Sequence, residues 1–216
     1  EAFVHYLDLG LYFEAFDEFV RRINPNTDAK GIYKHIRPGK ILEKEGRIEN
    51  VLKPGQMIIV QIVKEPISTK GSRLTAEISL AGRNIVLLPF AEKVSVSQKI
   101  SSKEEKRRLE TLVRSILPKN YGAIIRTAAE GKNAAVLDAE LMSLVEKWEN
   151  SWKKLAQSKG VQLLFTEYSK TTTILRDLLN DSFTNIYVNN ENIYEETRKY
   201  ISLISPEQEK IVKLYK

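Results

Sequence analysis

The sequence predicts a mixed fold in which α+β regions are followed by an α/β segment. Short apolar runs bounded by glycine or turn residues are typical of buried strands, and longer segments repeat apolar residues at helical spacing. Near the C-terminus, predicted strands alternate with predicted helices, a pattern that favours parallel pairing of the strands. The clearest apolar runs lie at 57–64, 84–88 and 123–125, and the clearest helical repeats at 102–117 and 134–158.

Composition agrees with a folded chain and limits its chemistry. With 216 residues, of which 42% are hydrophobic, one or two domains with a sizeable core are expected. The absence of cysteine excludes disulfides and thiolate metal sites and suits a reducing cytoplasm, where we expect the protein to reside. The two histidines lie far from any acidic cluster, so no metal site is predicted in this chain. No apolar run reaches the roughly 18 residues that a membrane-spanning helix needs.

The net charge of +6 is compatible with nucleic-acid binding but does not require it. Cations are concentrated in Lys93–Arg114 and Lys147–Lys159. These segments either follow a phosphate backbone or form the solvated faces of helices, and the sequence leaves both interpretations open.

The first 76 residues are predicted to be mostly β structure, interrupted by a helix and polar loops. Strands are expected at Ala2–Tyr6, Met57–Lys64 and Ser72–Leu80, with turn residues before the second and third. A helix is expected at Tyr12–Ile23, where the apolar residues repeat at helical spacing.

A hinged pair of strands is predicted next. Glu77–Leu80 and Asn84–Leu88 form the two strands, and Gly82 between them permits positive φ or a close backbone approach.

The helix that follows, Ser102–Leu117, opens with Ser102 and Glu105 as a capping box and is ended by Pro118. Its cations are interpreted as a solvated face, with RNA contact as the alternative: Lys106, Arg107, Arg108 and Arg114.

The segment Tyr121–Lys132, YGAIIRTAAEGK, contains the candidate site. Its apolar run is read as a buried strand that places Arg126 and Thr127 at its end. A guanidinium, a hydroxyl and the following backbone N–H groups are donors that suit a terminal phosphate. The alternative is a surface salt bridge and a turn.

A long helix is predicted at Ala134–Ser158, ended by Gly160. Trp148 and Trp152 are four residues apart and share its apolar face, so burial is favoured over base stacking.

The C-terminal α/β segment is predicted to contain strands at Val161–Glu167 and Asn185–Val188 and helices at Thr173–Asn180 and Tyr194–Ser205. Its carboxylates lie on helix surfaces without a convergent geometry, so they predict no metal site.

The chain resembles the bacterial ribonuclease E/G family of RNA endonucleases. IIRTAAEGKN followed by LMSLVEKWENSW is similar to the family's 5′-sensor region, with further similarity in EISLAGRNIVLLP and RDLLNDSFTNIYVNNENIYEETRKYI. The resemblance covers nearly the whole chain. It implies a partial OB-type β-barrel that binds RNA over residues 1–76, an α+β 5′-sensor region over 77–170, and part of a ribonuclease H-like α/β subdomain over 171–216.

The resemblance also implies the roles of individual sensor residues. Arg126 and Thr127 correspond to the pair that grips the 5′-monophosphate of RNA, and Gly82 and Val86 to the pocket wall. For Val86, the residues alone favour the alternative, packing in the strand core. Gln98 stands where the family has an arginine near the RNA 5′ end, with Lys99 beside it as a less directional donor.

The motif departs from the family at one further position, where Ala129 replaces a glycine. If that glycine requires positive φ, alanine costs roughly 1 kcal/mol or reshapes the loop.

In the barrel, Phe3 corresponds to an aromatic that stacks on a base, worth about 1–3 kcal/mol, although burial in the core is the alternative. Lys70 corresponds to a second RNA contact. The family's first two barrel strands have no counterpart here, so we expect exposed strand edges and poor order unless another segment pairs with them.

The family cuts RNA with two aspartates that hold Mg²⁺, and a cysteine pair in some members links subunits through a structural zinc. The resemblance places both beyond Lys216, so this chain is expected to be a fragment that binds single-stranded RNA with a 5′-monophosphate and does not cut it. The full-length protein is expected to be a homo-oligomeric endoribonuclease of rRNA maturation and mRNA decay. The alternative is a non-catalytic RNA-binding or protein-interaction module with a degenerate sensor.

Overall fold

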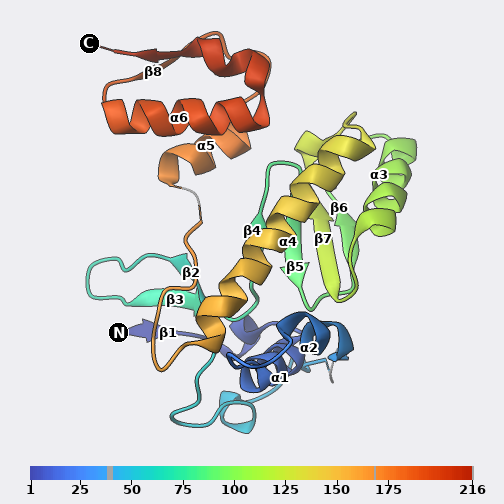
Figure 1. The fold of residues 1–216 in the computed structure, drawn as a ribbon, viewed down its shortest axis with the longest axis vertical. Helices are drawn as coiled ribbons and strands as arrows, with labels where there is room; N and C mark the ends of the chain where they lie inside the picture. Colours follow the sequence, from blue (N-terminus) through green and yellow to red (C-terminus); the bar gives the residue numbers. More distant parts are fainter. Residues whose placement is uncertain (38–40, 168, 216) are drawn as a thin grey trace. The chain divides into compact units, whose positions relative to one another are not determined.

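The computed structural model describes residues 1–37, 41–167 and 169–215. It contains small mixed sheets and several helices, which confirms the predicted mixed fold class (Figure 1). The chain folds into two compact units, Glu1–Phe165 and Thr166–Lys216. The division into three parts at residues 76 and 170 stays a prediction.

A four-stranded sheet lies at the centre of the first unit. Its strands are ordered β4 (Leu80–Ala81), β5 (Ile85–Pro89), β7 (Tyr121–Ile125) and β6 (Val94–Val96). β5 is antiparallel to both β4 and β7, whereas β6 is parallel to β7. Strand β7 is therefore internal to the sheet, and both of its edges are paired.

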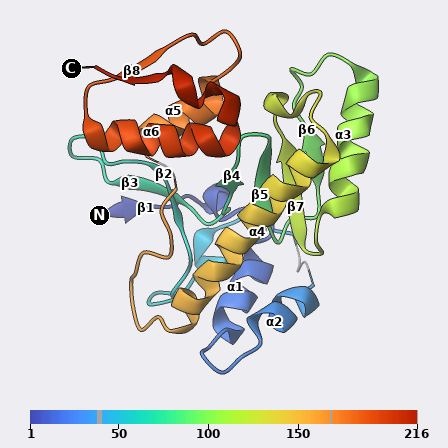
Figure 2. The ribbon, with the colours of Figure 1, turned by 45° about the horizontal axis from the view of Figure 1, so that its top comes forward.

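Helices α3 (Lys103–Ile116) and α4 (Ala134–Ala156) pack on this sheet and contact each other. Figure 2 shows α4 running across the sheet with α3 beside it. The sheet residues that the helices cover alternate along the strands and are fully buried: Ile85, Leu87, Ala123 and Ile125. Apolar alternation along strands and helical stripes on two helices thus meet in one core.

Both helices begin and end near the predicted residues. The Ser102 hydroxyl accepts the N–H of Glu105 at 3.2 Å, and the Asn133 side chain accepts the N–H of Val136 at 3.0 Å. These N-caps satisfy donors that the first helical turn leaves without an intrahelical partner.

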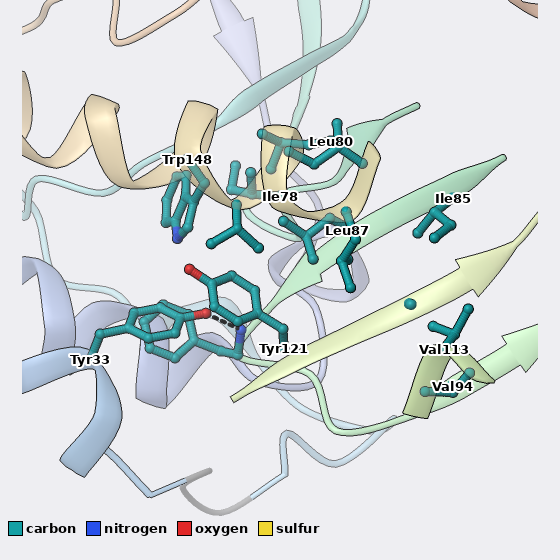
Figure 3. Close-up of a cluster of buried hydrophobic side chains, with 14 of the residues drawn as sticks. Tyr33, Ile78, Leu80, Ile85, Leu87, Val94, Val113, Tyr121 and Trp148 are labelled. Atoms are coloured by element: carbon teal, nitrogen blue, oxygen red, sulfur yellow. Dashed lines mark hydrogen bonds between the residues drawn. The ribbon is translucent and has the colours of Figure 1, made fainter. Parts of the chain in front are cut away.

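An aromatic cluster joins α4 to the two N-terminal helices, α1 (Phe13–Arg22) and α2 (Ala29–His35). The Tyr33 ring stacks on Trp152 with centroids 5.0 Å apart and lies 4.8 Å from that of Tyr121. Figure 3 shows Tyr33 and Tyr121 side by side next to Trp148. Both tryptophans are buried, which confirms their predicted role in the core.

Helix α2 was not predicted from the sequence, and its position depends on hydrogen bonds. The Tyr33 hydroxyl donates to the Asn120 carbonyl at 2.9 Å and accepts the N–H of Phe90 at 3.1 Å. The Asn120 side chain in turn donates to the carbonyls of Tyr33 and Ile36. This buried network ties α2 to the residue immediately before β7.

A three-stranded sheet contains β1 (Ala2–Phe3), β3 (Ser72–Thr75) and β2 (Gln61–Lys64) in that order. No closed barrel forms within the residues that the structure describes. The prediction of one strand over Ser72–Leu80 was wrong, because the N–H of Ala76 donates to the Asp8 carbonyl and the chain leaves the sheet there. The predicted strands at Ala2–Tyr6 and Met57–Lys64 are shorter than expected.

The second unit contains α5 (Lys170–Leu178), β8 (Ile186–Val188), α6 (Glu191–Ile204) and β9 (Val212–Leu214). β8 and β9 pair in parallel. β9 was not predicted from the sequence, and it takes the place of the partner strand that was expected at Val161–Glu167. The helices and the sheet share a small core of their own: Leu175, Leu179, Val188, Tyr200, Ile201 and Val212.

The strand predicted at Val161–Glu167 was wrong. Residues 161–167 form no strand, and Val161 and Leu163 are 98% and 70% exposed. The Gln162 side chain donates to the Lys154 carbonyl at 2.6 Å, and the Phe165 ring packs edge-on against Trp148. The segment therefore follows the end of α4 and has no strand partner.

Candidate phosphate-binding site at the end of strand β7

Arg126 and Thr127 leave the sheet directly after β7, between two flanking loops. Ile125, the last residue of β7, pairs with Ile85 at the start of β5 and with Val96 at the end of β6. The turn 82–84 therefore lies on one side of the pair, and residues 97–100 lie on the other.

Arg126 is held by the turn 82–84. Its backbone N–H donates to the Asn84 carbonyl at 2.8 Å, and its Nη1 donates to the Gly82 carbonyl at 2.9 Å. The side chain is half-buried. A backbone hydrogen bond and a side-chain hydrogen bond to the same turn give the guanidinium a defined direction.

Thr127 contacts the other loop. Its exposed hydroxyl lies 2.9 Å from the Ser97 hydroxyl, which also accepts the N–H of Lys99 at 3.3 Å. Ser97 is fixed in turn, because its N–H donates to the Ile125 carbonyl at 2.8 Å. The segment containing Gln98 and Lys99 is thereby joined to Thr127.

Gln98 and Lys99 are both exposed, and an additional cation reaches this loop. The Lys106 ammonium of α3 lies 3.5 Å from the Gln98 carbonyl. Gln98 thus has one lysine next to it in sequence and the ammonium of another next to its backbone carbonyl. The sequence interpretation of Lys106 as a solvated residue missed this contact.

The loop after Thr127 uses its amides internally. The N–H groups of Ala129, Glu130 and Lys132 donate to carbonyls three residues earlier, and that of Gly131 donates to the Glu105 carboxylate at 2.8 Å. For these four amides, the expectation that they are available to a phosphate was therefore wrong. The side chains of Arg126 and Thr127 are the candidate donors at this position.

The alanine at position 129 carries no conformational cost. Ala129 is fully buried and is not among the residues with positive φ, whereas Gly131, two residues later, has φ of 71°. The left-handed backbone position in this loop is thus occupied by a glycine. The conditional penalty of roughly 1 kcal/mol for Ala129 does not apply.

An ion pair on helix α3 is hydrogen-bonded to the same loop. Glu105 pairs with Arg108 at 2.7 Å, and Arg108 donates to the Lys132 carbonyl at 2.9 Å. The hydrogen bond from Arg108, followed by that from the Gly131 N–H, lowers the pKa of Glu105 to about 2. Sequence reasoning gave Glu105 only a capping role, since Gly131 lies 26 residues away.

Gly82 has no room for a side chain. A Cβ atom there would meet the Glu140 carboxylate and lie 2.8 Å from the Ile85 carbonyl. Its φ is not in the left-handed region, so close approach rather than unusual backbone geometry explains the glycine.

Val86 lies on the sheet face opposite the core. It pairs with Ala81 and Ile124, and Ile124 is 40% exposed. Val86 is half-buried, so its alternative assignment to the strand core was wrong. Its role as a pocket wall stays a prediction.

The two residues expected to bind RNA in the N-terminal part lie at or near the three-stranded sheet. Phe3 is 42% exposed and packs edge-on against His5, so burial in the core was the wrong alternative. Lys70 is exposed in the turn before β3. Their contacts with RNA stay predictions.

Two features are absent from the described part of the chain. No group of three or more His, Cys, Asp or Glu side chains is arranged to hold a metal ion. No helix there combines the length and the hydrophobicity that crossing a membrane requires.

The chain is similar in sequence to known proteins. The sequence model of the Ribonuclease E/G family matches residues 79–216. The chain is 32% identical over 209 residues to the Ribonuclease E/G-like protein of Pyropia yezoensis. This alignment covers 93% of this chain and 41% of that protein.

Bacterial relatives are similar over a shorter part of the chain. Ribonuclease E of Nostoc sp. strain PCC 7120 is 32% identical over 77% of this chain and 24% of its own length. Ribonuclease G of Escherichia coli strain K12 is 34% identical over 74% of this chain and 33% of its own length. The chain thus spans less than half the length of each of these relatives. Because the family match covers residues 79–216, well over half of the chain, the protein belongs to the ribonuclease E/G family.

Proposed function

We propose that this chain binds single-stranded RNA and selects it by a 5′-monophosphate, as the recognition part of an endoribonuclease. One observation carries the proposal: Arg126 and Thr127 leave the end of β7 together, each held by a different neighbouring loop. A terminal phosphate would accept from the guanidinium and from the threonine hydroxyl at once. Relatives named Ribonuclease E and Ribonuclease G support RNA as the ligand.

The expected strength follows from the chemistry of charged hydrogen bonds. One such bond contributes roughly 1.5–3 kcal/mol, which corresponds to about 10- to 150-fold in affinity. Lys99, on the loop beside Thr127, and Lys106, on α3 next to that loop, would add electrostatic attraction that depends more on salt. The preference for a terminal phosphate should therefore depend mostly on Arg126.

Fluorescence anisotropy with a ten-nucleotide RNA, labelled at an internal base, tests the proposal. Three RNAs are compared: one with a 5′-monophosphate, one with a 5′-hydroxyl, and one with a 5′-hydroxyl and a 3′-phosphate. The native chain should prefer the first by about tenfold or more. The third RNA controls for added charge, because it carries the same group at the wrong end.

Two variants complete the experiment. Arg126→Ala should abolish the preference, whereas Arg114→Ala should preserve it. Arg114 is a matched control, since it loses the same charge and pairs with Glu110 on its own helix. Equal binding to all three RNAs, unaffected by Arg126→Ala, would refute the sensor and favour a general RNA-binding module.

For the longer parent protein we propose the activity that the resemblance implies, cleavage of single-stranded RNA in rRNA maturation and mRNA decay within the cytoplasm. Mg²⁺ would serve that reaction, and a structural zinc and homo-oligomerisation would accompany it in some members. The described residues contain no cluster that fits either metal, so the chemistry of cleavage is not assigned to any residue here.

A further inference from the structure

Glu140 is an acidic residue that α4 turns toward the sheet. It lies between Leu137 and Leu141, both fully buried, at a position that the helical periodicity assigns to the apolar face. Its carboxylate accepts the N–H groups of Arg83 and Asn84, with both carboxylate oxygens within 3.1 Å of the Asn84 nitrogen. A partly buried carboxylate that accepts two consecutive amides fixes the turn that contains them.

The opposite side of the same turn holds Arg126. The Gly82 carbonyl accepts Nη1 of Arg126, and the Asn84 carbonyl accepts its backbone N–H. The amides of Arg83 and Asn84 thus point to a carboxylate on α4, and the carbonyls of Gly82 and Asn84 point to the arginine at the end of β7. Burial raises the pKa of Glu140, while the amide hydrogen bonds and the charge of Arg126 act in the opposite direction.

The Glu140 carboxylate lies directly against Gly82 of the turn. Glu140 occupies the space that a side chain at position 82 would need. The Glu140 carboxylate therefore contacts the turn, and the turn contacts the Arg126 guanidinium. Glu140 itself needs no contact with a bound phosphate, because its negative charge would repel the phosphate.

We infer that Glu140 is a positioning residue of the phosphate site. It fixes the turn 82–84 so that the Gly82 carbonyl holds the Arg126 guanidinium in its binding direction before RNA arrives. Its effect on RNA rests on the proposed function, whereas its effect on the turn does not. Ordering one long side chain in advance should raise the phosphate preference by roughly 2- to 12-fold.

The test uses Glu140→Gln, which removes the charge and keeps the size, and Glu146→Gln as its matched control. Glu146 is an exposed acidic residue on the same helix. Glu140→Gln should lose roughly 2- to 12-fold of the preference for 5′-monophosphate over 5′-hydroxyl RNA, and Glu146→Gln should lose none. Glu140→Ala, which also leaves a void, should lose at least as much of this preference as Glu140→Gln.

A double variant separates positioning from general destabilisation. If Glu140 acts through Arg126, adding Glu140→Gln to Arg126→Ala should not change the remaining RNA affinity further. Similar additional losses in both backgrounds would overturn the inference, because they would show that Glu140 affects binding without Arg126.

Amide hydrogen exchange in the RNA-free protein provides a readout independent of the proposed function. Glu140→Gln should accelerate exchange at Arg83, Asn84 and Arg126 but not at Val136, at the start of the same helix. Unchanged exchange at the first three amides would overturn the inference. If the native chain shows no phosphate preference, the proposed function fails, and the exchange result alone decides whether Glu140 fixes the turn and Arg126.

Discussion

Replacing Tyr33 by phenylalanine should strongly destabilise the first unit. The hydroxyl of Tyr33 joins α2 to the residues around β7 by donating to Asn120 and accepting from Phe90. All three residues are at most 5% exposed, so water cannot replace the lost partner. Burial raises the pKa of Tyr33, which keeps the hydroxyl protonated and able to donate.

The magnitude follows from the two groups left without a partner. Each buried polar group without a hydrogen bond costs about 1–3 kcal/mol, so the two groups together should lower the free energy of unfolding of Tyr33→Phe by roughly 2–6 kcal/mol. Urea unfolding monitored by tryptophan fluorescence measures this loss. Both tryptophans of the chain, Trp148 and Trp152, lie in the same core as Tyr33, so the signal reports on the first unit.

Tyr12→Phe is the matched control, since it removes a hydroxyl that makes no hydrogen bond within the described residues. It should change the free energy of unfolding by less than about 0.5 kcal/mol. If Tyr33→Phe has an equally small effect at an unchanged urea dependence, the buried network does not stabilise this unit, and the reasoning is refuted.

Three further predictions use the same unfolding assay. The folded-state pKa of Glu105, about 2, lies below its ordinary value of 4.5, so its ionised form stabilises the fold above about pH 4.5 and this contribution is lost as the pH falls toward 2. The stability difference between native chain and Glu105→Gln should therefore shrink from pH 7 to pH 3, and a constant difference would contradict the assignment. Gly82→Ala should destabilise by about 1–3 kcal/mol, because the added methyl group meets Glu140 and the Ile85 carbonyl; an unchanged urea midpoint would show that the turn can move aside. Val161→Ser should alter stability by less than about 0.5 kcal/mol, and a larger loss would indicate that this exposed residue pairs or packs after all.

Local patterns predicted the elements whose signals lie within one segment. α3 and α4 combine an apolar stripe with an N-cap, and β7 is a short apolar run, so each could be placed from its own residues. Helix α2 offers no such signal, because Tyr33 is its only buried residue. At Val161–Glu167 an apolar run looked like a strand, yet a strand also needs a partner, and the sequence does not show one.

The residues of the candidate site also fall into two groups, those that a local pattern reveals and those that it does not. Arg126 and Thr127 were recognisable because they are adjacent and resemble a known motif. Glu140 and Glu105 act on groups 56 and 26 residues away, so no local pattern reveals their partners. A signal for Glu140 was nevertheless present, since a charged residue on the apolar face of a helix requires a buried partner.

The internally bonded loop between β7 and α4 also constrains how this protein can vary. Glu130 and Lys132 are exposed and can be exchanged without disturbing the backbone hydrogen bonds. An inserted or deleted residue, however, would shift Gly131 away from Glu105 and move the left-handed position onto a residue with a side chain. In a library of variants, this segment should tolerate changes of side chain and reject changes of length.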